Sequence, residues 1–172
     1  MEYKKTERLM DHSNMIYNSD IRINNPLYLM KQVEYLIKFG FENRNSSSII
    51  YACLESRISL ELLDLEKIKL SVNEKDRIEI IEESKPKNGI EKIGKNIGVL
   101  KERYQLFFQA ICEVCLLEFK HYDFKKSKDL QNNLSKYIHS YYMNDSELEF
   151  DSQNIQDAIL LIKDVDEFIR NS

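Results

Sequence analysis

Apolar residues recur three or four positions apart along most of the chain, which is the spacing of a buried helix face. The first such run follows Asn25-Pro26, a favourable helix start, and predicts a helix over 26–39 that ends at Gly40. A second run follows three serines and predicts a helix over 47–70. The residues expected to form its inner stripe are Ile50, Leu54, Ile58, Leu62 and Leu65.

The remaining patterns extend the same reading to the end of the chain. Ser71 and Glu74 have capping-box spacing and predict a short helix through Glu83, which the breaker SKPKNG then ends. The strongest pattern predicts a helix over 90–119 with almost entirely apolar inner positions. Two further helices are expected at 127–140, capped by Ser127, and at 152–170 with the apolar face Ile155, Ile159, Ile162, Val165 and Ile169.

No segment shows the alternation typical of a strand, so the sequence predicts an all-α, single-domain helical bundle of about five main helices. Residues 1–24 are polar and weakly periodic, and we expect an N-terminal arm there and the bundle domain over 25–172. The chain has 172 residues, 42% of them hydrophobic, with only 4 glycines and 2 prolines, which fits a globular protein rich in long helices.

Charge and cysteine content narrow the classes of function. A net charge of -4 argues against a protein that coats nucleic acid by bulk electrostatics. No apolar run approaches the roughly 20 residues of a membrane-spanning helix, and the N-terminus lacks the apolar core of a signal peptide. Three cysteines do not form a disulfide framework. We therefore expect a cytoplasmic protein without membrane contacts.

Familiar catalytic and metal-binding motifs are missing from the sequence. Cys112 and Cys115 form a CxxC, but they lie inside the most apolar predicted helix, where structural packing is the simpler reading. The three histidines have no metal-binding spacing, and the glycines form no phosphate loop. Gly94 and Gly98 lie one turn apart and indicate close helix packing. The sequence predicts no metal and no cofactor.

Candidate chemistry converges on the run QNNLSKYIHSYY, residues 131–142. His139 closes the helical pattern there, and a histidine that titrates near neutrality can exchange protons with a ribose hydroxyl or a leaving oxygen. Asn132 and Ser135 precede it on the same predicted face, and Lys136 adds charge. The competing reading is a histidine placed at a helix C-terminus by the helix dipole.

Arg57 and Glu61 form a second candidate group, one turn apart beside the stripe of the predicted helix 47–70. They can orient one another beneath a phosphate site, or they can be an ordinary ion pair on the surface of a bundle helix.

Two segments resemble the HEPN family, helical domains common in prokaryotic defence and toxin systems. LSKYIHSYY resembles the late family helix, in which a histidine ends an R-x4-6-H motif, and ACLESRISLELLDLE resembles an earlier helix with an arginine and a glutamate one turn apart. Members with the full motif are metal-independent ribonucleases that commonly dimerise with their motif residues facing a shared cleft. The resemblance makes His139 the motif histidine.

The motif arginine does not carry over. Leu134, Asn133 and Asn132 stand where the arginine would precede His139 by four, five or six intervening residues. None of them supplies the permanent charge that stabilises a phosphate transition state.

The resemblance and this departure from it leave the question of enzyme activity open. The first hypothesis is a protein that binds RNA or cleaves it as a weak or degenerate metal-independent endoribonuclease, in a defence or toxin–antitoxin setting. His139 would transfer protons, and Asn132, Lys136 or Arg57 would hold phosphate. The alternative is a non-catalytic homodimeric helical module with a protein partner. A third reading is a nucleotide-binding bundle, with tyrosines that stack on a base.

Overall fold

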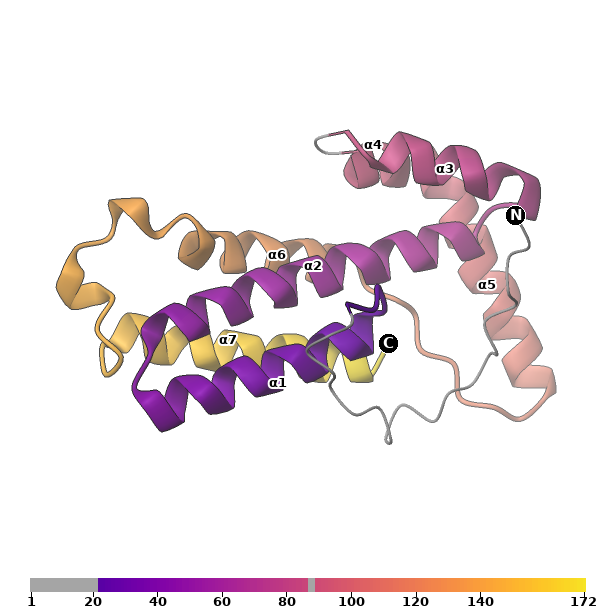
Figure 1. Ribbon diagram of the computed structural model, residues 1–172. Coiled ribbons are helices and arrows are strands. Elements are labelled where there is room, and N and C mark those ends of the chain that lie inside the picture. The colour runs from indigo at the N-terminus through magenta and orange to yellow at the C-terminus, as the bar shows by residue number, and fades with distance from the viewer. Residues whose placement is uncertain (1–21, 87–88) are drawn as a thin grey trace.

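The structure is a computed structural model that describes residues 22–86 and 89–172, and this part of the chain contains seven α-helices and no strand (Figure 1). The all-α class is confirmed, while the expected count of about five main helices is too low. The helices are α1 (Pro26–Asn43), α2 (Ser46–Leu70), α3 (Arg77–Ser84), α4 (Gly89–Asn96), α5 (Gly98–Val114), α6 (Phe124–Ile138) and α7 (Gln153–Arg170), with short 3-10 turns η2 (Glu74–Asp76), η3 (Ser140–Tyr142) and η4 (Asp145–Glu147).

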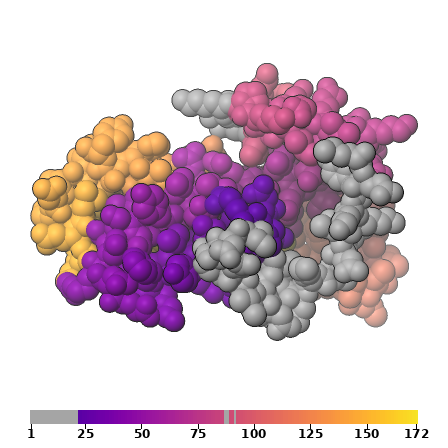
Figure 2. All heavy atoms as spheres, viewed as in Figure 1, coloured from indigo at the N-terminus to yellow at the C-terminus, as the bar shows by residue number. Residues whose placement is uncertain are grey.

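Four long helices form the body of the molecule, and α2 packs against α1, α6 and α7 (Figure 1). The main hydrophobic core lies between these four helices and includes Met30, Leu60, Leu134 and Ile162, each at most 1% exposed. The α3–α4 segment lies over one end of α2, where it rises above the rest of the surface in Figure 2. A second, smaller cluster of buried residues, Ile68, Ile80 and Ile93, holds it there.

The buried side of α2 differs from the expected stripe of Ile50, Leu54, Ile58, Leu62 and Leu65. All five of those residues are only half-buried. The fully buried side is made largely of smaller residues, and it faces the neighbouring helices because α2 is packed on three sides. Small side chains let those helices approach closely. The residues with no exposed surface are Ile49, Ala52, Cys53, Ser56, Ser59 and Leu60.

Gly40 does not end the first helix, as the sequence predicted. It lies inside α1 and is buried, and the helix continues to Asn43 and closes with Arg44 in the left-handed conformation at φ 49°. A Cβ at Gly40 would lie 2.8 Å from Ile49 Cδ1 on α2. Glycine is therefore required for the close approach of α1 and α2 and not for a turn.

The predicted helix 90–119 is divided into α4 and α5 by Ile97, which leaves the helical conformation at φ -101° and ψ 18°. α4 contributes Ile93 to the smaller core, but none of the residues of α5 is buried. The expectation of a buried apolar face along this whole segment was therefore wrong for α5. The close packing expected at Gly98 is also absent, since nothing lies within 4 Å of a Cβ built there.

The ends of α6 and α7 follow simple capping rules. Asp123 caps α6 by accepting a hydrogen bond from the backbone N of Lys126, so Ser127, the predicted cap, lies one turn inside and is buried. Ser152 caps α7, whose predicted apolar face is buried at all five positions. Ser71 opens no capping box; it ends α2 and donates its hydroxyl to the Lys67 carbonyl.

Most of the predicted N-terminal arm, residues 1–21, lies outside the described residues. Within residues 22–86 and 89–172, no helix has both the length and the apolar character needed to cross a membrane.

Candidate functional site on the α2–α6 face

Arg57 on α2 reaches across to α6, where its Nη1 donates a hydrogen bond of 3.0 Å to Ser135 Oγ. Its Nε donates to Glu61 Oε1, also at 3.0 Å, so the predicted pair on α2 is present. Ser135 Oγ in turn donates to the Gln131 carbonyl at 2.8 Å. These bonds fix the guanidinium between the two helices, with 32% of the side chain still exposed. Arg57 therefore presents a permanent, oriented charge on this face.

His139 ends α6 as its C-cap, in agreement with the sequence prediction of a histidine at the helix end. Its backbone N donates to the Ser135 carbonyl at 3.1 Å, so Ser135 contacts both Arg57 and His139. The imidazole is exposed and makes an edge contact with Tyr141 at 6.4 Å between ring centroids. Its nitrogens have no hydrogen-bond partner among the described residues, and they are open to a ligand.

Asn132 and Lys136 are exposed on α6 beside this arrangement. At about 100° per residue, Asn132 and His139 lie on the same side of Ser135, while Lys136 is turned further around the helix. Lys136 Nζ lies 5.2 Å from the centre of the Tyr137 ring, and its carbonyl accepts a hydrogen bond from Tyr142. Asn132 thus shares a face with Arg57 and His139, and Lys136 flanks that face.

A cavity of 480 Å³ lies next to Arg57, between α2, α6 and the α4–α5 region. Its volume is in the range of small-molecule sites. Five basic and two acidic side chains line it, so its wall carries a positive balance that favours an anion. The charged lining residues are Arg57, Lys85, Lys95, Lys101, Lys128, Glu61 and Asp64.

Sequence reasoning missed Asp64, a buried carboxylate in the wall of this cavity. Its two oxygens accept hydrogen bonds of 2.7 Å from Tyr122 Oη and from Gln131 Nε2. Burial raises the pKa of Asp64, and the hydrogen bonds together with the positive charge of Lys101 oppose that rise. The available signal was an acidic residue on the small-residue side of α2.

Lys101 completes the cavity wall from α5. Its Nζ lies 3.9 Å from the centre of the Phe124 ring, a cation–π contact. Burial lowers the pKa of Lys101, and the Asp64 carboxylate opposes that effect. The cavity therefore joins the Arg57–Ser135–His139 face to a second group of basic side chains further along α6.

The sequence-predicted site residues are therefore gathered on one side of the molecule. Arg57, the candidate from α2, is joined to α6 by a hydrogen bond, although 78 positions separate it from Ser135. Among the described residues, no group of three or more histidine, cysteine, aspartate or glutamate side chains is arranged to hold a metal ion. Comparison of the chain with protein-family models, with curated proteins and with solved structures found no match.

Proposed function

We propose that the protein binds RNA along the α2–α6 face and cleaves it weakly without a metal ion. The observation that carries this proposal is the hydrogen bond from Arg57 to Ser135, because it brings a permanent cation onto the helix that His139 ends. Arg57 then takes the part of the arginine that the R-x4-6-H spacing lacks, from a different helix. Asn132 and Lys136 add a hydrogen-bonding group and a charge at the edge of the face.

The chemistry that suits these groups is attack of a ribose 2′-hydroxyl on the adjacent phosphate. The P–O2′ bond forms and the P–O5′ bond breaks, which leaves a 2′,3′-cyclic phosphate and a 5′-hydroxyl end. His139 exchanges the proton of the attacking or the leaving oxygen. Arg57 stabilises the negative charge that develops on the phosphate oxygens. Both groups belong to one chain, so this scheme needs no second subunit.

Binding and cleavage of a fluorescent single-stranded RNA in the presence of EDTA test the proposal. In Arg57→Gln we expect weaker binding and a salt dependence of log K lower by about 0.7, the value for one lost phosphate contact on a single strand. In His139→Ala we expect binding to remain and cleavage to fall at least about 100-fold. DNA of the same sequence should bind without being cleaved, since it lacks the 2′-hydroxyl.

Matched controls are available on other faces of the molecule. Arg170 pairs with Asp166 one turn away, as Arg57 pairs with Glu61, and His121 is an exposed histidine bonded to two glutamines. Arg170→Gln and His121→Ala should behave as the unmodified protein. The proposal fails if RNA does not bind at low salt, or if Arg170→Gln weakens binding as much as Arg57→Gln.

A second candidate function is a non-catalytic dimeric interaction module. The observation that favours it is α5, a helix with seven large apolar side chains at least 37% exposed. If His139→Ala leaves all RNA-directed activity unchanged, this candidate remains and the first does not.

A further inference from the structure

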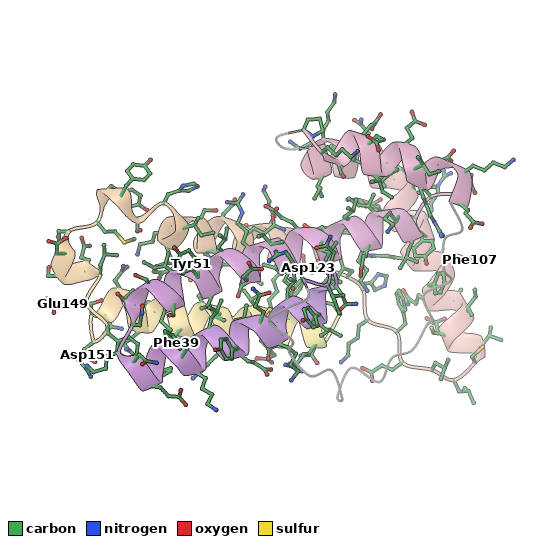
Figure 3. The ribbon with its side chains drawn as sticks, in the orientation of Figure 1. Phe39, Tyr51, Phe107, Asp123, Glu149 and Asp151 are labelled. Atoms are coloured by element: carbon green, nitrogen blue, oxygen red, sulfur yellow. The ribbon has the colours of Figure 1, made fainter. Side chains whose placement is uncertain are left out.

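The apolar face of α5 has no partner in the chain as described. Seven of its large apolar side chains are between 37% and 85% exposed. Together they present on the order of 800 Å² of apolar surface, which is about what each partner contributes to a stable interface. Monomeric proteins rarely expose so much contiguous apolar surface. Figure 3 shows Phe107, near the middle of this helix, at the outer edge of the molecule.

The order of these side chains along α5 is that of a helix-pairing surface. Leu100, Tyr104, Phe107, Ile111 and Val114 follow one another at intervals of four, three, four and three residues. This is the spacing of the core positions of a two-helix coiled coil. At about 100° per residue all five fall within a sector of about 80°, so they form one continuous stripe. The helix of 17 residues is long enough for two heptads.

We infer that α5 is a homodimerisation helix, which pairs with α5 of a second copy of this chain in antiparallel orientation. A surface that pairs with itself about a twofold axis needs only to be self-complementary. In the antiparallel arrangement Phe107 lies near the axis, and the Leu100 end of one helix packs against the Ile111–Val114 end of the other. Each copy buries the same stripe, so no apolar surface of α5 remains unpaired.

The charges of α5 favour the antiparallel orientation over the parallel one. Arg103 is exposed within the apolar face, and Glu113 is exposed near the C-terminal end of the helix. A parallel pair would place Arg103 beside Arg103 of the second copy. An antiparallel pair places it near the second copy's acidic end, where the long side chain can reach Glu113 at the rim.

This dimer is independent of the proposed RNA site. α5 lies at the opposite end of the bundle from η3, which directly follows His139 (Figure 1). The α5 pair therefore leaves both α2–α6 faces open and does not bring the two His139 side chains into a shared cleft.

Sedimentation equilibrium of the full chain tests the inference. We expect a dimer of twice the 20.5 kDa chain mass, and in Phe107→Glu a loss of at least about 100-fold in dimer affinity, since two charges would be buried near the axis. Leu160→Glu, at a position 57% exposed on α7, is the matched control and should remain dimeric. Because Phe107 is 62% exposed, its substitution should leave the helical circular dichroism unchanged. A monomeric unmodified chain, or a dimeric Phe107→Glu, would overturn the inference.

A charge exchange tests the orientation separately. Arg103→Glu should weaken the dimer by roughly threefold to tenfold, and addition of Glu113→Arg should restore it. A parallel dimer would replace one like-charged pair with another, so neither change would matter much. Equal affinity of the single and double variants would therefore refute the antiparallel arrangement.

Discussion

The residue with the clearest energetic signature is Asp64, because it is a carboxylate only 7% exposed in the wall of the cavity. Burial raises its pKa above the ordinary value of 3.8. The folded protein thus holds this proton to a higher pH than the unfolded chain does. The contribution of Asp64 to the free energy of unfolding is therefore largest below about pH 3.8 and is lost as the pH rises through the raised pKa.

Replacement of Asp64 by asparagine should remove this pH dependence. Between about pH 4 and neutrality, we expect the stability of the unmodified protein to fall relative to that of Asp64→Asn, and urea unfolding at a series of pH values measures both. Asparagine keeps an oxygen for Tyr122, and rotation of the Gln131 amide supplies it with an acceptor. The control is Asp129→Asn, at an exposed position on α6. Parallel stability curves for Asp64→Asn and the unmodified protein would contradict the account.

At the scale of single residues, sequence reasoning found the exposed groups and missed the buried ones. His139 was placed correctly at the end of a helix because apolar periodicity stops there. The hydrogen bonds of Asp64 join α2 to Tyr122, 58 positions away, and to Gln131. No local pattern encodes such a long-range pairing, so the network became visible only in the structure.

Helix ends are the features of the elements that local chemistry determines best. Asn25 was predicted to begin α1, and its Oδ1 accepts a hydrogen bond of 3.1 Å from the backbone N of Tyr28. We expect Asn25→Ala to reduce the free energy of unfolding by about 1 kcal/mol, because one backbone N–H of the first turn loses its acceptor. Urea unfolding measures the loss, and Asn24→Ala, at the exposed neighbouring position, is the control. An equal loss in both variants would show that the cap bond contributes nothing.

The buried faces of helices were predictable only where one side of the helix is buried. α7 packs its five periodic apolar residues inward, and the sequence identified all of them. α2 is covered by α1, α6 and α7, so small residues such as Ala52 and Ser56 are buried while larger ones lie at the edges. α5 has the strongest apolar pattern in the chain and yet contains no buried residue. A periodic apolar face predicts a partner, but it does not say whether that partner belongs to the same chain.

The molecule as a whole has two hydrophobic cores of unequal size. The larger core joins α1, α2, α6 and α7, whereas the smaller one rests on Ile68, Ile80 and Ile93 beneath α3 and α4. A region held by fewer buried contacts opens at a lower free energy than the global unfolding of the protein. We therefore expect the α3–α4 segment to open independently, and this segment also forms part of the cavity wall.

Hydrogen exchange followed by mass spectrometry measures that difference directly. Backbone amides of α3 and α4 should exchange faster than those of α1, α2 and α7 under conditions that favour the folded state. Ile93→Ala should speed exchange in α3 and α4 alone, because it removes one of three buried residues of the smaller core. Leu134→Ala should lower the protection of all four long helices together, by about 2–5 kcal/mol, because its cavity lies in the shared core. If Ile93→Ala instead accelerated exchange equally in α1 and α7, the two cores would unfold as one unit, and the cavity wall would be as rigid as the bundle that carries Arg57 and His139.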